Sequence, residues 1–168
     1  DGDGRMDLLV GAPEESVGST ADAGLVHVIY GSGGWSNNDG FYQNTSGWPD
    51  ASESGDRFGS ALTTGDFNND GYDDIVVGVP SEDLGSSNQL IDAGIITIAY
   101  GSASGLASPV NMHQYSPGVG TNSESGDLFG AALASGDING DGYDDVIVGV
   151  PGEGISKRDR AGAVHVIY

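Results

Sequence analysis

The chain has 168 residues and carries 5 Lys and Arg residues against 25 Asp and Glu residues, which gives a formal charge of −20. This charge excludes nucleic acid as a partner, because phosphate binding needs clustered Lys and Arg, and it opposes attraction to an anionic membrane surface. The chain contains no Cys, which excludes disulfides, thiolate metal sites and Cys nucleophiles. No apolar run approaches the roughly 18 residues of a membrane span, so we expect no direct membrane insertion, and we expect any export signal to lie outside this chain.

Short apolar runs along the chain predict ten β-strands and no helix. The runs are rich in β-branched residues and are bounded by Gly, Asp or Pro, which is typical of strands. No segment of useful length shows the period of a helix. In chain order, we expect the strands around residues 7–11, 25–30, 41–43, 58–62, 74–78, 95–100, 112–114, 129–133, 145–149 and 163–168.

An internal repeat organises these strands. Residues 53–80 align without gaps with residues 124–151, and 20 of the 28 aligned pairs are identical; residues 1–13 align with residues 68–80. Four short strands in a period of about 70 residues are typical of a propeller blade. We therefore predict an all-β, β-propeller-type array of four-stranded antiparallel blades. The first repeat (1–46) would lack its first strand, the second (53–116) would be complete, and the third (124–168) would lack its fourth strand, about two and a half blades in all.

An acidic loop separates the first and second strands of each repeat. In residues 66–74 and 137–145, oxygen-bearing side chains occupy loop positions 1, 3, 5 and 9, and Gly occupies position 6. Calcium takes six to eight oxygen ligands, and a short loop can wrap it when alternate side chains point inward and Gly permits a sharp turn. Position 7 would contribute its backbone carbonyl. The expected calcium ligands are Asp66, Asn68, Asp70, Tyr72 and Asp74 in the second repeat, and Asp137, Asn139, Asp141, Tyr143 and Asp145 in the third.

These loops also resemble two other kinds of acidic loop. An EF-hand needs Glu at position 12, where this chain has Val77 and Val148, so an EF-hand is excluded. Asp, Asn and Gly also form turns without any metal, but the three Asp residues at loop positions 1, 5 and 9 would repel one another without a cation. The first repeat has only part of the pattern, with Asp1, Asp3, Arg5 and Asp7 at positions 3, 5, 7 and 9. The sequence thus predicts two or three bound Ca²⁺ ions.

The repeated motifs resemble the FG-GAP repeats that build the seven-bladed propeller of integrin α-subunits. The motifs are Phe58-Gly59 and Phe129-Gly130, Gly11-Ala12-Pro13, and its variants Gly78-Val79-Pro80 and Gly149-Val150-Pro151. The resemblance implies that calcium is structural rather than catalytic, that the protein is extracellular or on the cell surface, and that ligands meet the face opposite the acidic loops. On this chain, that face would comprise the loops 14–22, 47–57, 81–92, 116–127 and 152–160.

The ligand itself is not specified by any motif. The loop 152–160 holds three of the five basic residues, Lys157, Arg158 and Arg160, which could capture an acidic group but could also be a solvated loop. Trp35 and Trp48 could stack on a sugar, although such residues more often pack between blades. We expect a protein or carbohydrate ligand.

Catalysis is not expected, because there is no nucleophile elbow, Walker loop or dinucleotide fingerprint. The function predicted from the sequence is a binding and adhesion module. The alternatives are a non-catalytic segment of a larger secreted enzyme and a self-assembling lectin-like ring. Since propellers close with about four to eight blades, the chain would need either the remaining blades of a longer protein or association into a homo-oligomer.

Overall fold

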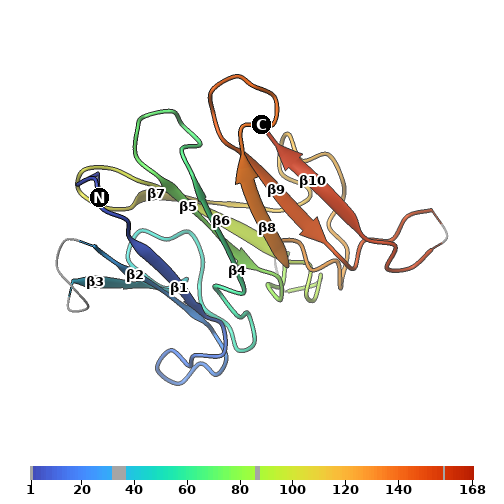
Figure 1. Ribbon diagram of the computed structural model, residues 1–168. Helices are drawn as coiled ribbons and strands as arrows, with labels where there is room; N and C mark the ends of the chain where they lie inside the picture. Colours follow the sequence, from blue (N-terminus) through green and yellow to red (C-terminus); the bar gives the residue numbers. More distant parts are fainter. Residues whose placement is uncertain (1, 32–36, 86–87, 157) are drawn as a thin grey trace.

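A computed structural model describes residues 2–31, 37–85, 88–156 and 158–168, and it is all-β (Figure 1). Ten strands form three antiparallel sheets, which do not close into a ring. The first sheet contains β1 (Leu8–Ala12), β2 (Leu25–Ile29) and β3 (Asn38–Phe41). The second contains β4 (Ala61–Gly65), β5 (Asp74–Val79), β6 (Ile95–Tyr100) and β7 (Ala107–Met112). The third contains β8 (Ala132–Gly136), β9 (Asp145–Val150) and β10 (Ala163–Ile167).

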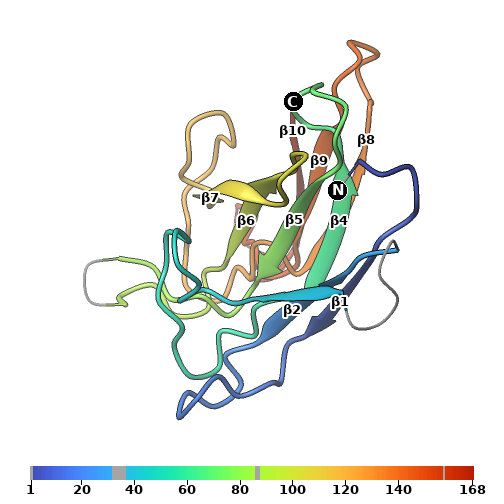
Figure 2. The same ribbon diagram turned by 90° about the vertical axis from the view of Figure 1, so that its left-hand side faces the viewer.

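The sheets confirm the predicted propeller-type array of partial blades. The middle sheet has four strands in chain order, and the two outer sheets have three each. The strands expected around 58–62 and 129–133 begin three residues later, and those expected around 41–43 and 112–114 lie three to five residues earlier. Strand β8 lies beside β4 (Figures 1 and 2), where the Thr63 and Ser135 hydroxyl oxygens are 2.7 Å apart. None of the described residues is helical, so this part of the chain contains no helix that could span a membrane.

The position of a sheet in the array decides how deeply its strands are buried. All six residues of β5 are buried, because the middle sheet is covered on both faces. At equivalent positions of the outer sheets, apolar side chains face solvent: Leu8 is 48% exposed whereas Ile75 is 5% exposed, and Val164 is 67% exposed whereas Ile96 is fully buried. The apolar faces of the two outer sheets therefore lack the cover that the middle sheet has.

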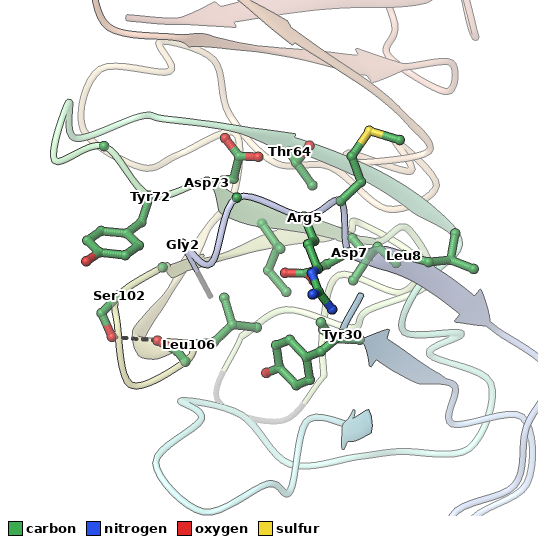
Figure 3. A pocket seen from close by; sticks show the side chains of 18 residues that line it. Gly2, Arg5, Asp7, Leu8, Tyr30, Thr64, Tyr72, Asp73, Ser102 and Leu106 are labelled. Carbon is green, nitrogen blue, oxygen red and sulfur yellow. Dashed lines mark hydrogen bonds between the residues drawn. The ribbon is translucent and has the colours of Figure 1, made fainter. Parts of the chain in front are cut away.

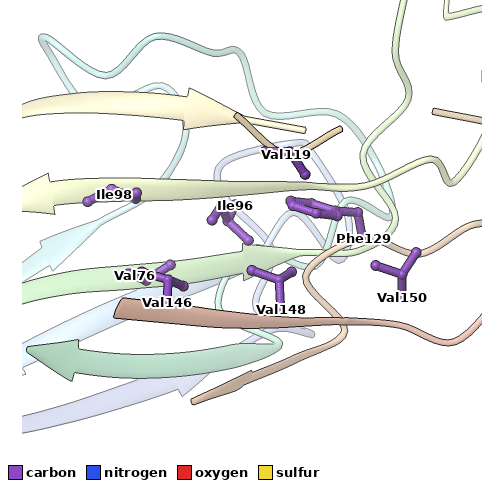
Figure 4. Close-up of a cluster of buried hydrophobic side chains, with 8 residues drawn as sticks. All are labelled: Val76, Ile96, Ile98, Val119, Phe129, Val146, Val148 and Val150. Atoms are coloured by element: carbon purple, nitrogen blue, oxygen red, sulfur yellow. The ribbon is translucent and has the colours of Figure 1, made fainter. Parts of the chain in front are cut away.

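Two equivalent hydrophobic cores hold the sheets together. Phe58 is the largest side chain of the core that joins the first and second sheets, and Phe129 takes the same place between the second and third (Figure 4). Both Phe side chains are fully buried. Around Phe129 lie β-branched side chains from both sheets: Val76, Ile96, Ile98, Val146, Val148 and Val150.

Backbone contacts between neighbouring repeats explain why the Phe-Gly and Gly-x-Pro motifs recur. The Phe129 N–H donates to the Ala93 carbonyl oxygen at 3.0 Å. At Gly94, with φ of +82°, a Cβ would lie 2.3 Å from the Phe129 oxygen, and at Gly78 a Cβ would lie 2.2 Å from the Gly130 oxygen. Only glycine permits an approach this close. The same contacts recur at the first junction through Phe58, Ala23, Gly24, Gly11 and Gly59.

Candidate functional site

The two complete acidic loops form the hairpin connections β4–β5 and β8–β9, and Figure 1 shows both at the upper end of their sheets. Each loop turns through two residues in the left-handed conformation. These are Asn69 (φ 56°) and Gly71 (φ 89°) in one loop, and Gly140 (φ 79°) and Gly142 (φ 92°) in the other. Asn and Gly are the residues that adopt this conformation most readily, so the local sequence favours the turn.

Side-chain oxygens of the second-repeat loop wrap around its backbone. Asp66 accepts hydrogen bonds from the Asp70 N–H through Oδ1 at 3.0 Å and from the Gly71 N–H through Oδ2 at 2.9 Å. Asn68 Oδ1 also accepts from the Asp70 N–H, at 2.9 Å. Asp70 Oδ1 accepts from the Tyr72 N–H at 2.9 Å. The oxygens expected at ligand positions 1, 3 and 5 are thus held on one side of a tight turn.

The third-repeat loop repeats this arrangement. Asp137 accepts from the Asp141 N–H at 3.1 Å and from the Gly142 N–H at 3.0 Å. Asn139 Oδ1 accepts from the Asp141 N–H at 2.8 Å, and Asp141 Oδ1 accepts from the Tyr143 N–H at 3.0 Å. Two loops that differ in sequence at their second and fourth positions adopt the same hydrogen-bonded turn.

The ninth loop residue is buried in both repeats and ties the loop to its sheet. Asp74 Oδ2 accepts from the Phe67 N–H at 3.0 Å, and Oδ1 accepts from the Gly101 N–H at 2.7 Å. Asp145 Oδ2 accepts from the Ile138 N–H at 2.8 Å. Burial raises the pKa of Asp74; the hydrogen bonds from Gly101 and Phe67 lower it, while the charges of Asp70 and Asp66 raise it further. These carboxylates therefore repel one another.

The donor set of each loop fits a hard divalent cation. It consists only of carboxylate, amide and carbonyl oxygens, the ligands that Ca²⁺ takes. Asp145 Oδ1 is buried without a hydrogen-bond partner, so this oxygen is available to a cation. In the described part of the chain, no three His, Cys, Asp or Glu side chains converge as a metal cluster. Coordination would therefore need the carboxylates to draw inward from their backbone hydrogen bonds.

The first-repeat loop differs from the other two. Asp3 Oδ1 accepts from the Arg5 N–H at 2.8 Å, and Asp7 Oδ1 accepts from the Gly31 N–H at 2.9 Å. Asp7 thus accepts a hydrogen bond from Gly31 as Asp74 does from Gly101 in the second repeat. Asp1, the other expected ligand, lies outside the described residues.

A cavity of about 550 Å³ lies beside this first loop, between the first and second sheets (Figure 3). Its lining includes Arg5, Tyr30, Tyr72 and Leu106. At the next junction, Phe67 packs against the core in the equivalent place. No motif of the sequence indicates a ligand for this cavity, and we assign none.

Sequence reasoning missed a Gln–Glu pair of side chains at the opposite end of each junction, buried at the first junction and partly buried at the second. Gln43 Nε2 donates to Glu82 Oε2 at 2.6 Å, and Gln114 Nε2 donates to Glu153 Oε2 at the next junction. Gln43 and Gln114 are buried, and the Oε1 atom of each has no hydrogen-bond partner. The repeat contains a signal for this pair, because both members recur at the same spacing of 71 residues.

Two buried carboxyl groups near the first junction, those of Glu82 and Asp56, predict that the stability of the fold decreases as pH rises. Burial raises the pKa of Glu82 to about 9, helped by the charges of Asp50 and Asp56, and burial raises the pKa of Asp56 to about 6. Both values exceed those of the unfolded chain, so the folded state binds more protons, and the unfolding free energy decreases from about pH 4 to about pH 9.

Replacing Glu82 with Gln is therefore expected to stabilise the protein at pH 8, by about 1–3 kcal/mol, and to flatten the pH dependence. The new amide would be neutral and could donate to the unpartnered Gln43 Oε1. Thermal unfolding in saturating calcium from pH 5 to pH 9 measures this. The exposed Glu14→Gln variant is the control. If the unfolding temperature of Glu82→Gln depended on pH in the same way as that of the unmodified protein, Glu82 would not be the source of the pH dependence.

The residues considered for ligand binding lie in different environments. The partly buried ring of Trp48 packs against the core, 5.6 Å from the ring of Phe41 and 5.4 Å from that of Phe58, so it has a packing role. Arg158 and Arg160 are exposed, and Arg158 lies in a tight turn paired with Ile155. Trp35 and Lys157 lie outside the described residues.

The expected ligand face is built by loops that bond to one another. The Gly55 N–H donates to the Ala21 carbonyl at 3.1 Å, and the Gly126 N–H donates to the Ile91 carbonyl at 2.8 Å. Each of these bonds joins the loop between the second and third strands of one repeat to the start of the next repeat. The loops of this face therefore hold fixed positions relative to one another.

Known proteins contain repeats similar to those of this chain. The FG-GAP repeat family matches residues 1–29, 58–98 and 129–167. Integrin alpha-PS5 of Drosophila melanogaster is 33% identical over 90% of this chain and 14% of its own length, and mouse integrin alpha-8 is 35% identical over 95% of this chain and 13% of its own. Human phosphatidylinositol-glycan-specific phospholipase D is 34% identical over 89% of this chain and 17% of its own length.

The chain thus spans about one sixth or less of these relatives. The family matches cover more than half of the chain, and each includes strands of a different sheet. The chain belongs to the FG-GAP repeat family and is similar to integrin α-subunits.

Proposed function

We propose that this chain is a calcium-stabilised FG-GAP module for extracellular binding and adhesion, without catalytic activity of its own. The observation that carries the proposal is the identical wrap of side-chain oxygens in the two complete acidic loops. Asp66, Asn68, Asp70 and Asp74 would hold one ion with the Tyr72 carbonyl. Asp137, Asn139, Asp141 and Asp145 would hold another with the Tyr143 carbonyl. The incomplete first loop is not assigned an ion.

Calcium would act here by removing repulsion and fixing the hairpin. Four carboxylates lie within the nine residues of each loop, three of them at expected ligand positions, and a bound divalent cation offsets their charge. Because the site exists only in the folded chain, the binding free energy adds to the stability of the fold. Sites in extracellular modules have dissociation constants of about 10⁻⁴–10⁻³ M, which suits the calcium concentration outside cells.

Calorimetric titration of the calcium-free protein tests this part of the proposal. We expect two Ca²⁺ ions per chain, one ion in either Asp66→Asn or Asp137→Asn, and weaker binding of Mg²⁺, which demands a stricter octahedral geometry. Asn keeps one hydrogen-bond acceptor for the turn, so these variants should remain folded. Absence of calcium binding up to millimolar concentrations would contradict the proposal.

The ligand is proposed to be a protein or a glycan that docks on the loops opposite the acidic ones. The integrin relatives support this proposal, as do the hydrogen bonds that fix these loops. The basic loop offers a direct test: the triple variant Lys157→Ser, Arg158→Ser, Arg160→Ser should abolish capture of an acidic ligand on arrays of extracellular proteins and glycans. Unchanged capture would exclude this loop as the contact.

A second candidate function rests on the similarity to phosphatidylinositol-glycan-specific phospholipase D, whose name is that of an enzyme. In that case the chain would be a non-catalytic segment of a larger secreted enzyme. A catalytic domain in the full-length reading frame would favour this candidate, and a full-length protein without one would contradict it.

Both candidates require cover for the outer sheets, from further blades of a longer chain or from other copies of this chain. Light scattering in millimolar calcium separates the two sources. A discrete oligomer that dissociates on chelation would indicate self-association, whereas a monomer would indicate further blades.

A further inference from the structure

The second and third acidic loops are joined by a pair of reciprocal hydrogen bonds. The Asp66 N–H donates to Asp144 Oδ2 at 3.0 Å, and the Asp144 N–H donates to the Asp66 carbonyl oxygen at 3.1 Å. Asp66 is the first residue of the second-repeat loop, and Asp144 is the eighth residue of the third-repeat loop. Both polar groups of the Asp66 backbone are therefore held by one residue of the next repeat.

The chain is adapted to this close approach at Gly65. A Cβ at Gly65 would lie 2.7 Å from Asp144 Oδ2 and 2.9 Å from Asp144 Cβ. At Gly136, the equivalent position of the third repeat, an added Cβ would meet no atom within 4 Å. The short contact at Gly65 is therefore specific to the junction between the two loops.

Asp144 stands between two positions that would hold an ion. Its neighbours, Tyr143 and Asp145, are the seventh and ninth loop residues, so an ion in the third-repeat loop would restrict the backbone on both sides of Asp144. A fixed Asp144 would in turn fix Asp66, whose carboxylate is the first ligand of the other loop. An ion in one loop thus reduces the ordering that the second ion must bring about.

We propose that Asp144 couples the two acidic loops, so that calcium binding in either loop raises the affinity of the other; this proposal rests on the calcium function proposed above. Asp144 is a positioning residue, since it acts on Asp66 and is not itself one of the expected ligands. Coupling between binding sites is reciprocal, so each ion must strengthen the other by the same factor.

The test uses calcium titrations followed by NMR, read at the Gly71 amide for the second-repeat loop and at the Gly142 amide for the third. Asp144→Ala is expected to weaken binding in the second-repeat loop by about five-fold, at the lower end of typical couplings. Asp144→Asn, which keeps an acceptor for the Asp66 N–H, should recover most of the loss. The matched control is Asp73→Ala, which removes the exposed Asp at the same position of the other loop and should leave the third-repeat loop unchanged.

A second readout does not depend on metal. In calcium-free protein, the Asp66 amide should exchange its hydrogen several-fold faster in Asp144→Ala than in Asp73→Ala. Unchanged affinity at Gly71 in Asp144→Ala, with calcium bound in both loops, would overturn the coupling and leave the calcium function intact. An unmodified chain that binds no calcium would overturn both.

Discussion

Chelation of calcium is expected to lower the midpoint of thermal unfolding by about 10 °C. With about 10 mM calcium and dissociation constants of about 10⁻⁴–10⁻³ M, each site stabilises the fold by about 1.4–2.7 kcal/mol. Two sites together contribute about 3–5 kcal/mol, and each kcal/mol corresponds to about 2–4 °C in a domain of this size. Differential scanning calorimetry with and without chelator measures this shift.

Single-site variants divide this effect between the two loops. Asp66→Asn and Asp137→Asn should each remove more than half of the calcium-dependent shift, because the remaining site also loses the affinity gained by coupling, and the double variant should remove nearly all of it. In the absence of calcium, the double variant should unfold at or above the temperature of the unmodified protein, because each loop has lost one of the carboxylates that repel one another within it. An unmodified protein whose midpoint is the same in calcium and in chelator would contradict the account.

Truncation of the central aromatic side chain of either core is the second large expected effect. Phe58→Ala and Phe129→Ala should each lower the unfolding free energy by about 3–5 kcal/mol, because each removes a fully buried ring from a packed junction. The loss of a ring leaves a cavity that β-branched neighbours on fixed strands cannot fill.

Urea denaturation measures these differences at equilibrium. Tyr115→Ala is the control, since Tyr115 is 73% exposed and its truncation should change the unfolding free energy by less than about 0.5 kcal/mol. If Phe129→Ala is too unstable to purify, Phe129→Leu should show a smaller loss in the same direction. A loss below about 1 kcal/mol for both Phe→Ala variants would show that the sheets are not held by these cores.

Much of the fold follows from short-range patterns. Strands such as β5 and β6 are continuous β-branched runs with turn residues on either side, so the sequence predicts their position and their burial. The repeat also predicts a fourth strand in the first two repeats, but it places these strands around 41–43 and 112–114, whereas they span Asn38–Phe41 and Ala107–Met112. The recurrence of a motif in more than one repeat thus predicts that a strand exists, but it does not fix where the strand begins and ends.

The contacts between repeats could not be predicted in the same way. The Asp144–Asp66 bonds span 78 residues and the Gln43–Glu82 bond spans 39, and each depends on how two sheets approach each other. Trp48 shows the same limit. In sequence it stands among loop residues, but in the structure its ring packs against the first core, and Val119, 71 residues later, is part of the second core. Sequence periodicity indicates which face of a strand is apolar, but it does not indicate what covers that face.

Within the acidic loops, the sequence predicts the sharp turn and the positions of the expected ligands. The structure adds a second role for the ninth residue. The pattern treats Asp74 and Asp145 as ligands only. In the structure they are buried and tie the start of the second strand to the loop backbone, and Asp74 also bonds to the Gly101 N–H after β6. This second role explains why a carboxylate stands at the beginning of a fully buried strand.

The most direct test of the account is a residue-resolved calcium titration of the unmodified protein, followed by ¹H–¹⁵N correlation spectra. The account predicts saturable chemical-shift changes at Gly71, at Gly142 and at the neighbouring loop residues. The N–H groups of these two glycines donate to the first carboxylate of their loops. Residues at the opposite loops should not shift. Spectra in which neither glycine responds to millimolar calcium would contradict the central claim that these loops hold calcium.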